Sequence, residues 1–215
     1  MSTQHTVKQG EHLSGIAATY GFADWHALWD HPENAALKEK RKNPNVLFPD
    51  DQVFIPDKEQ KKESISAGAS HKFTLRKPKV TLRIALRGID DHPLANTKCE
   101  LQVDGKSFPV TSNGDGLVEQ EVPAGASGGK LVVKGVDGFP DLDIPIKIGH
   151  LDPVEEISGQ VARLNNLGYN AGPADEIDGK LFPAAVEEFQ CDQGLTVDGT
   201  CGPKTQAKLR EIHGC

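Results

Sequence analysis

The chain has 215 residues, of which 24 are Lys or Arg and 31 are Asp or Glu, so its formal net charge at pH 7 is −7. Its aromatic content of 6% and mean hydropathy of −0.45 argue against one large core and favour several small modules. The sequence contains no run of about 18 apolar residues that could cross a membrane. Its net acidity also argues against a surface that binds nucleic acid through the phosphates, so we expect a soluble, multi-module protein.

The charge and the composition change along the chain in a way that indicates domain boundaries. Residues 151–215 carry five basic and eleven acidic side chains, so this last part holds nearly all of the net charge. The stretch DKEQKKESISAGAS, residues 57–70, has no apolar periodicity and is typical of a linker. A second boundary falls at GHLDP, where a strand pattern gives way to a helical one. These features predict a multi-domain α+β chain with domains at residues 1–56, 71–149 and 151–215.

The middle segment has the alternating pattern of β-strands. Apolar residues occupy every second position in residues 80–86 and 142–148. Pro145 cannot donate a ladder hydrogen bond, which predicts that the second of these runs is an edge strand. Asp104-Gly105 lies between two apolar runs and predicts a tight hairpin turn. Roughly seven short strands at this spacing predict an all-β sandwich.

Part of this middle segment resembles known families. The stretch PLANTKCELQVDGKSFPVTSNGDGLVEQEVPAG is similar to immunoglobulin-like and carboxypeptidase-regulatory-like domains. The resemblance implies a spacer or adhesion role. No cluster of catalytic or ligand-binding residue types lies there, so we interpret residues 71–149 as an Ig-like β-sandwich spacer.

The N-terminal segment predicts a strand, two helices and a second strand in residues 1–56. HTVKQGEHLSGIAATYGF indicates a short strand, a turn and a helix, and NPNVLFPDDQVFIP indicates a turn followed by an alternating strand. Trp25, Leu28 and Trp29 lie at i, i+3 and i+4 on the second helix. In a domain this small, tryptophans in that pattern are more typical of the core than of a sugar-stacking surface.

An additional helix is predicted before the last strand of this segment. The stretch HPENAALKEKRK begins it at Pro32 and ends it in a basic cluster. The cluster comprises Lys38, Lys40, Arg41 and Lys42. We favour a solvated helix end whose charges complement the helix dipole. The alternative is a contact with an acidic partner or with glycan phosphates.

Residues 5–56 resemble a LysM domain, because HTVKQGEHLSGIA and NPNVLFPDDQVFIP match its two signature ends. The resemblance implies a βααβ fold that binds glycans containing N-acetylglucosamine, chiefly peptidoglycan and chitin. It places the glycan-binding groove between two loops: Gly10, Glu11, His12, Leu13 and Ser14 on one side, and Asn45, Val46, Leu47, Pro49 and Asp50 on the other. Backbone hydrogen bonds to N-acetyl groups and apolar contacts with sugar faces would supply the binding. This extended, tryptophan-containing form resembles modules associated with bacterial contractile injection systems.

The C-terminal segment carries an amphipathic helix followed by an internal repeat. Residues 153–169 place Ile157, Val161, Leu164 and Leu167 on one face, and Gly168 ends the helix. Each repeat unit is an Asp-led turn followed by a helix, with the same spacing in residues 175–186 and 198–209. This pattern predicts a small helical module whose core Leu209 and Ile212 complete.

Residues 154–213 resemble the peptidoglycan-binding type 1 domain, because VARLNNLGY, AAVEEFQ, GLTVDG and GPKTQAKL match it in order. The resemblance implies a three-helix fold and peptidoglycan as the ligand. The candidate glycan-binding surface in this module lies near Tyr169, Asn170 and Asp198.

No constellation in the sequence indicates catalysis or a cofactor. The eight histidines include no HExxH motif and no recognised zinc-ligand spacing. The paired glutamates at 155–156 and 187–188 lie on helices, where adjacent side chains face apart, so they do not suit glycoside hydrolysis. Asp175, Glu176 and Asp178 suggest loop caps rather than a calcium site, because the EF-hand spacing is absent. We expect no enzyme activity, no metal and no cofactor.

Three of the four cysteines lie in the C-terminal module, at positions 191, 201 and 215, and the fourth is Cys99. A bridge between Cys191 and Cys201, or one that involves Cys215, is an alternative to reduced thiols. The first residues, MSTQHTVKQG, lack an apolar segment, so we expect no Sec-type signal peptide. Reduced thiols therefore agree better with the expected compartment.

These observations predict a non-catalytic peptidoglycan-binding protein with two cell-wall-binding modules joined by a β spacer. The alternative is a structural or adaptor subunit of a contractile injection system, of the type VI secretion or phage-tail-like kind, that uses these folds for protein contacts. A spike, tube or effector protein would then be the partner, and neither nucleic acid nor membrane insertion is expected. We expect the chain to stay cytoplasmic until it is assembled or exported by a non-Sec route, and to act at the cell envelope or within an injection particle.

Overall fold

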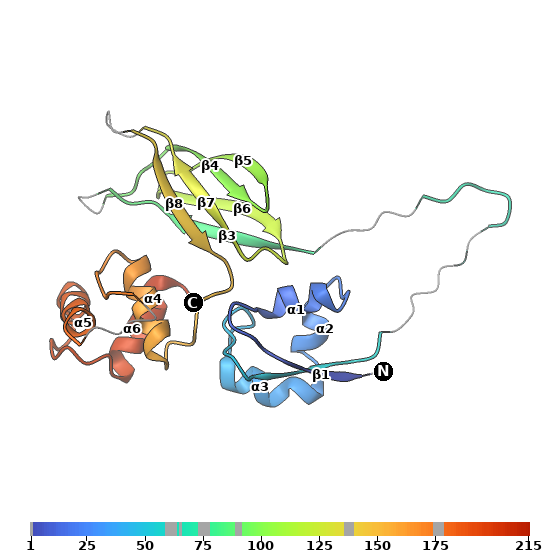
Figure 1. The fold of residues 1–215 in the computed structure, drawn as a ribbon, viewed down its shortest axis with the longest axis horizontal. Coiled ribbons are helices and arrows are strands. Elements are labelled where there is room, and N and C mark those ends of the chain that lie inside the picture. The colour runs from blue at the N-terminus through green and yellow to red at the C-terminus, as the bar shows by residue number, and fades with distance from the viewer. Residues whose placement is uncertain are drawn as a thin grey trace.

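A computed structural model describes residues 2–58, 64, 66–72, 78–88, 92–135, 140–173 and 179–215. It shows a small N-terminal module with both helices and strands, a middle module of antiparallel sheets, and a helical C-terminal module (Figure 1). Each module has its own cluster of buried apolar residues. The mixed α+β class is therefore confirmed, whereas the finer likenesses to LysM and immunoglobulin-like folds stay predictions.

In the N-terminal module, β1 (Thr3–Thr6) and β2 (Gln52–Ile55) form a two-stranded antiparallel sheet. Between them lie the helices α1 (Leu13–Thr19), α2 (His26–Trp29), the 3₁₀ helix η1 (Pro32–Asn34) and α3 (Ala35–Arg41). Trp29 belongs to the core, and Trp25, which is partly buried, packs against it. The two tryptophans therefore serve the core, as the helical spacing indicated.

Asn34 connects the helices of this module to its sheet. The residue is 2% exposed. Its side-chain amide donates to the carbonyl oxygens of Leu28 and Phe54, and its Oδ1 accepts from Phe54 N–H, all at 2.8 Å. Because every polar atom of the buried amide is paired, β2 and α2 are fixed to each other.

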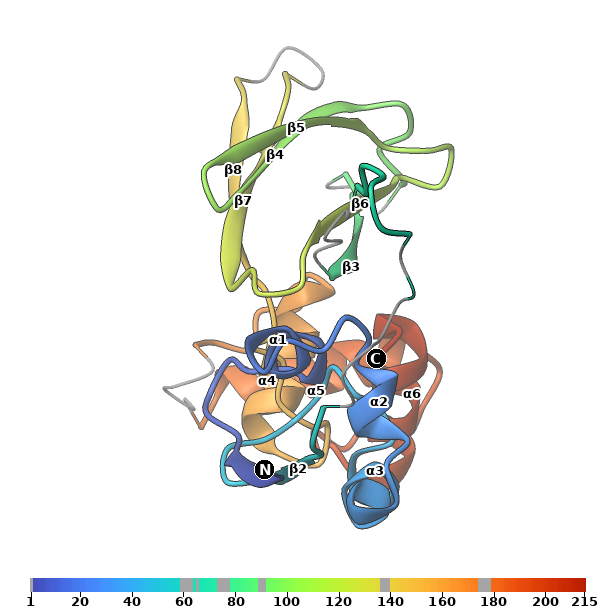
Figure 2. The same ribbon diagram turned by 90° about the vertical axis from the view of Figure 1, so that its right-hand side faces the viewer.

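The middle module contains two antiparallel sheets that face each other across one core (Figure 2). One sheet pairs β3 (Lys79–Ala85) with β6 (Leu117–Pro123). The other has the order β5 (Lys106–Thr111), β4 (Lys98–Val103), β7 (Gly128–Val133), β8 (Leu142–Lys147). The described part of this module thus has six strands against about seven expected, and Arg87 and Pro93 form only an isolated bridge.

Local features of the middle module agree with the sequence except at Leu142. β8 is an edge strand, as Pro145 predicted. Asp104 and Gly105 have φ values of 49° and 72°, which suit the tight hairpin turn between β4 and β5. Leu142 was expected to face the core, but it is 59% exposed because it is the first residue of the edge strand.

The C-terminal module consists of α4 (Ile157–Asn166), α5 (Leu181–Asp192) and α6 (Pro203–His213). Its core combines buried residues from all three helices: Val161, Leu164, Ala185, Val186, Phe189 and Leu209. Ile157 and Ile212 differ from the prediction, because they are 46% and 43% exposed. They occupy the first turn of α4 and the last turn of α6, beyond the reach of the other helices.

Some sequence predictions fall outside the described residues. Asp175, Glu176 and Asp178, which we expected to act as loop caps, belong to this group. Part of the predicted linker, at positions 59–63 and 65, does so as well.

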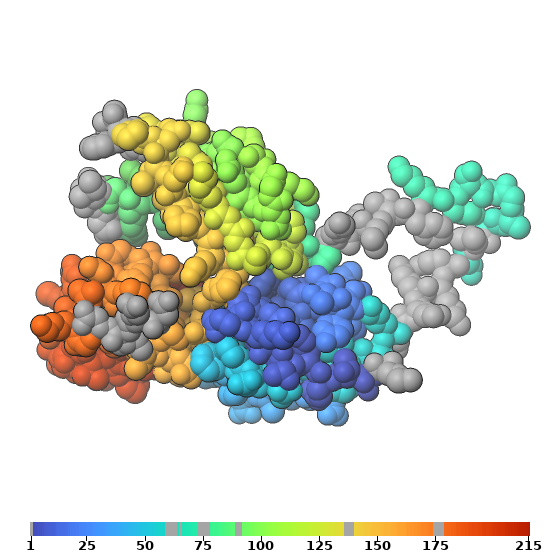
Figure 3. Space-filling model, viewed as in Figure 1, coloured from blue at the N-terminus to red at the C-terminus, as the bar shows by residue number. Residues whose placement is uncertain are grey.

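The segment between β8 and α4 is shared by the modules. Ile148 lies in the core of the middle module, and Val154 lies in the core of the C-terminal module. The space-filling view shows the three modules in contact around this segment (Figure 3). Gly159 on α4 allows the segment to pass close to the helix, because a Cβ there would overlap the carbonyl oxygens of Asp152 and Pro153.

We therefore predict that Gly159→Ala destabilises the protein by about 1–3 kcal/mol, because the segment must move away from α4 to make room for a methyl group. Urea denaturation measures the change in the free energy of unfolding. The matched control is Gly179→Ala, since a Cβ at that position meets no atom of the described residues within 4 Å. Equal effects of the two substitutions would contradict the close approach.

Candidate functional site

The structure brings the two loops of the predicted N-terminal groove together. His12 caps the start of α1, where its side chain accepts a hydrogen bond from Gly15 N–H at 3.4 Å. Leu13 N–H donates to Pro44 O at 3.1 Å, and Ser14 Oγ donates to Asn45 Oδ1 at 3.4 Å. The first loop is therefore attached directly to the second, whereas their role as a glycan-binding groove stays a prediction.

Half of the ten predicted groove residues are nevertheless buried. They are His12, Leu13, Ser14, Val46 and Leu47. Leu13 and Leu47 belong to the core of the module, so they support the fold rather than a ligand surface. Gly10, Glu11 and Pro49 are partly buried, and only Asn45 and Asp50 are exposed.

The first loop is covered by the segment that follows β8. A Cβ at Gly149 would lie 2.6 Å from His12 Cδ2 and 2.7 Å from Gly10 O, and one at Gly10 would lie 2.5 Å from His150 Cε1. The contact is extended by Gln9, whose Nε2 donates to Asp152 Oδ1 at 3.0 Å. In this arrangement the chain itself occupies the space beside Gly10 and His12.

The two ionisable residues of the first loop are held in fixed charge states. Burial lowers the pKa of His12, which favours the neutral imidazole. Partial burial alone would raise the pKa of Glu11, but hydrogen bonds from Lys8 N–H and from His5, both at 2.8 Å, bring that pKa below its ordinary value. Glu11 is therefore an anion whose carboxylate is already paired by hydrogen bonds from within the N-terminal module.

In the C-terminal module, Tyr169 is held against α5. Its ring makes an edge-to-face contact with Phe189 at 5.5 Å between centroids. Its hydroxyl donates to Asp192 Oδ2 at 3.0 Å. Burial, together with this hydrogen bond to an anion, raises the pKa of Tyr169 to about 12, so the hydroxyl stays protonated. Asn170, the neighbouring predicted residue, is exposed.

Asp198 has a structural partner that the sequence did not reveal. The buried Gln190 donates from Nε2 to Asp198 Oδ1 at 2.9 Å, and its Oε1 accepts from the N–H groups of Asp198 and Gly199. Thr200 O and Thr205 Oγ1 also lie 3.0 Å from Nε2, so its two N–H groups are shared among three acceptors. These hydrogen bonds, first from Gln190 and then from Thr200 N–H, lower the pKa of Asp198. One buried amide thus orders the whole 198–205 turn.

The predicted C-terminal residues do not form one constellation around α5. Tyr169 is bonded to Asp192, and Asp198 is bonded to Gln190. These two partners lie two residues apart on α5, so they project about 200° apart around the helix axis. Tyr169 and Asp198 are therefore bonded to different faces of α5.

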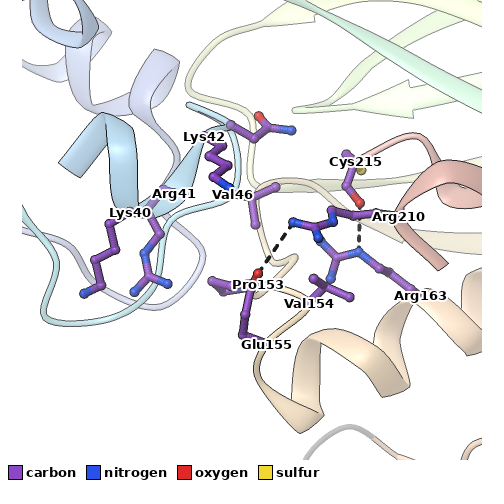
Figure 4. A pocket seen from close by; sticks show the side chains of 11 residues that line it. Lys40, Arg41, Lys42, Val46, Pro153, Val154, Glu155, Arg163, Arg210 and Cys215 are labelled. Carbon is purple, nitrogen blue, oxygen red and sulfur yellow. Dashed lines mark hydrogen bonds and ion pairs between the residues drawn. The ribbon is translucent and has the colours of Figure 1, made fainter. Parts of the chain in front are cut away.

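A cleft between the N-terminal and C-terminal modules was not predicted (Figure 4). Its enclosed volume is about 90 Å³. The end of α3 contributes Lys40, Arg41 and Lys42, and the C-terminal module contributes Arg163 and Arg210. Glu155 is the only acidic residue among those that line it.

The three lysines of the basic cluster at the end of α3 are exposed, as expected of a solvated helix end, whereas Arg41 is partly buried. Arg41 donates from Nε and Nη2 to the carboxylate of Asp51, at 2.6 and 2.9 Å, and Lys40 donates to the same carboxylate at 3.0 Å. Burial alone would raise the pKa of Asp51, but the hydrogen bonds from Arg41, Phe48 N–H and Lys40 lower it overall. Lys38 pairs separately with Asp30 at 2.6 Å.

The described residues show no arrangement with metal-binding or nucleophilic character. They contain no group of three or more His, Cys, Asp or Glu that could hold a metal ion. All four cysteines are free. Cys215 Sγ lies 3.1 Å from His213 Nδ1, but burial raises the pKa of the thiol and lowers that of the imidazole, which disfavours a thiolate–imidazolium pair.

Comparison with known families supports the C-terminal resemblance. Residues 161–209 match the family model PG_binding_1, a peptidoglycan binding domain. The match covers α5, most of α4 and the first part of α6. No curated protein matches the chain, and no solved structure matches it. The C-terminal module thus supports a role in binding the cell wall. Among the described residues, no helix is long and apolar enough to span a membrane.

We predict that Gln190→Met lowers the free energy of unfolding by about 2–3 kcal/mol, because the 198–205 turn loses its buried partner. Hydrogen exchange at the amides of Asp198 and Gly199 should become faster. Glu188→Gln, an exposed position on the same helix, is the control and should leave both measurements unchanged. Unchanged exchange in Gln190→Met would show that the turn is ordered by other contacts.

The stability of the folded protein is expected to depend on pH through His213. Burial, assisted by the positive charge of Arg163, lowers the pKa of His213 from 6.5 to about 4 in the folded protein. Between pH 6.5 and pH 4, His213 therefore binds a proton in the unfolded chain but stays neutral in the folded protein. Stability is full above pH 6.5 and falls as the pH drops toward 4.

The measurement compares the wild type with His213→Gln at pH 7.5 and pH 5. The wild type should lose more stability between these two values. The shift of His12 is present in both proteins and cancels in the comparison. Parallel losses in the two proteins would contradict a buried, neutral His213.

Proposed function

We propose that this protein is a non-catalytic peptidoglycan-binding protein whose C-terminal module makes the principal contact with the wall. The match of residues 161–209 to a peptidoglycan binding domain is the observation that carries the proposal. The matched residues also belong to a three-helix module with one continuous core. A chance sequence match would not be expected to coincide with such a module, so the fold supports the proposal.

The N-terminal module is proposed as a second glycan-binding module that is closed in this arrangement. Its first loop lies under Gly149 and His150. Sugar would reach that loop only after the segment moves away. Two sites on one chain raise the apparent affinity when both can engage the polymer, so opening would strengthen binding to intact wall.

Contacts within the chain also favour the second candidate function, an adaptor that uses these folds to hold proteins. The observation in its favour is that the covered loop meets a polypeptide segment through Gln9, Gly10 and His12. Co-purification of the chain with a spike or tube protein of an injection apparatus would support this candidate.

The contact surface on the C-terminal module is proposed to include Val197. Among the described residues, four large apolar side chains are exposed, and three of them belong to the C-terminal module: Ile157, Val197 and Ile212. Val197 is 53% exposed and precedes the turn that Gln190 orders. An exposed apolar side chain on a rigid turn is suited to contact with a sugar face or an N-acetyl methyl group.

We predict that the full chain sediments with purified peptidoglycan sacculi and that Val197→Ser weakens this binding about three- to ten-fold, as expected for the loss of one apolar contact of about 1 kcal/mol. Leu142→Ser, which removes an equally exposed leucine from the middle module, is the matched control and should bind like the wild type. A wild-type chain that stays in the supernatant would overturn the proposed function. Equal loss in both variants would place the contact elsewhere.

A further inference from the structure

The cleft between the N-terminal and C-terminal modules concentrates positive charge in an acidic protein. The chain as a whole carries a formal charge of −7. The cleft is nevertheless lined by five basic side chains and one acidic one. Figure 4 shows Arg41 and Lys42 on one wall and Arg163 and Arg210 on the other. The two modules thus create a site that neither has alone.

The charges on the N-terminal wall are only partly compensated. Lys40 and Arg41 share one carboxylate, that of Asp51. Lys42 is exposed, and in the part of the chain that the structure describes its ammonium group makes no ion pair. It follows α3 with a φ of 60°, a left-handed conformation that favours glycine over lysine. The backbone conformation at this position thus disfavours lysine, whereas the charged side chain contributes to the lining of the cleft.

The C-terminal wall offers two guanidinium groups with different roles. Arg163 is 1% exposed and donates from Nε and Nη1 to three main-chain oxygens. Its side chain also lines the cleft. Arg210 meets Glu155 at 3.5 Å, and both side chains are well exposed. A contact of this kind is weak, so a carboxylate from a ligand can replace Glu155.

We propose that this cleft binds a free carboxylate of the peptide stems of peptidoglycan. The inference rests on the proposed function and names the part of the wall polymer that this site takes. In it, Lys42 and Arg210 contact the carboxylate from opposite walls. Arg163 is mainly a positioning residue, because its guanidinium fixes the segment that carries Glu155.

The size and the charge of the site favour a small anion over a polyanion. An enclosed volume of about 90 Å³ suits a single small group such as a carboxylate, and the rest of a peptide stem would lie outside the cleft. A nucleic acid or another long polyanion would be disfavoured by the net charge of −7 on the chain as a whole. A stem carboxylate needs only the local charge, and guanidinium groups pair with carboxylates through charge-assisted hydrogen bonds. The cleft also borders the module that matches the peptidoglycan binding domain. One protein molecule could therefore bind a sugar and a peptide stem of the same polymer at the same time.

The test is calorimetric titration of the full chain with three soluble wall fragments: a disaccharide that carries a peptide stem, the same fragment with its carboxylates amidated, and the disaccharide without a peptide. The wild type should bind the free-carboxylate fragment about ten-fold more tightly than the amidated one, as expected for the loss of one charge-assisted contact. Lys42→Gly and Arg210→Gln should each remove most of that difference. Neither variant should change the affinity for the peptide-free disaccharide.

Lys42→Gly separates binding from folding, because glycine suits the left-handed backbone and should leave the melting temperature at least as high as in the wild type. Lys147→Gln, which removes one positive charge from the edge strand β8, is the matched control and should retain the ten-fold preference.

The outcomes separate the two proposals. If the wild type binds sacculi but does not distinguish free from amidated stems, the cleft proposal is overturned and the proposed function stands. If inorganic phosphate binds in the cleft more tightly than the stem fragment, the assignment to a carboxylate is overturned. If the wild type binds neither sacculi nor any fragment, both proposals are overturned.

Discussion

The buried guanidinium of Arg163 is the interaction on which the arrangement of this protein depends. It donates to the main-chain oxygens of Asp152, Gly159 and Cys215, at distances of 2.7 to 2.8 Å. The carbonyl dipoles of Asp152 and Gly159, together with the main-chain oxygen of Cys215, offset the cost of burying this cation. The same bonds tie the segment before α4 to both α4 and the end of α6. That segment in turn covers the first loop of the N-terminal module and forms one wall of the cleft.

This arrangement changes how the charge of the chain is understood. From the sequence, the excess of acid in residues 151–215 gave the C-terminal module no attraction for an anionic wall. In the folded protein, two arginines of that module face the basic end of α3 across the cleft. Positive charge is therefore gathered at one place in a chain whose net charge is −7. Such an arrangement suits recognition of a small anionic group at short range, and it suppresses non-specific adsorption of polyanions.

Much of the fold was predictable because it follows from local patterns. Strand alternation, the turn at Asp104-Gly105 and the edge position of Pro145 all agree with the structure. The errors lie at the ends of elements. Ile157, Ile212 and Leu142 fit the periodicity of their helices or strand, but they are exposed because no neighbouring element extends over them. Periodicity shows which face is apolar, not how far a neighbouring element reaches.

The candidate site was less predictable, because it depends on contacts between distant residues. The two loops of the predicted groove lie together, but their glycan-binding role stays a prediction, and nothing in the sequence shows that Gly149 and His150 lie on one of them. Gln190 could have been noticed, since it lies four residues after the buried Val186 on the inner face of α5. Arg163 gave a similar signal between Val161 and Leu164. A polar residue on a buried helical face needs partners, and only the structure identifies them.

The most direct test of the central claim is a binding isotherm of the full chain on purified sacculi, with soluble wall fragments assayed in the same supernatants. The account predicts saturable binding and no release of fragments at any protein concentration. Release of fragments would contradict a purely binding role, and an absence of saturable binding would contradict the assignment to the cell wall.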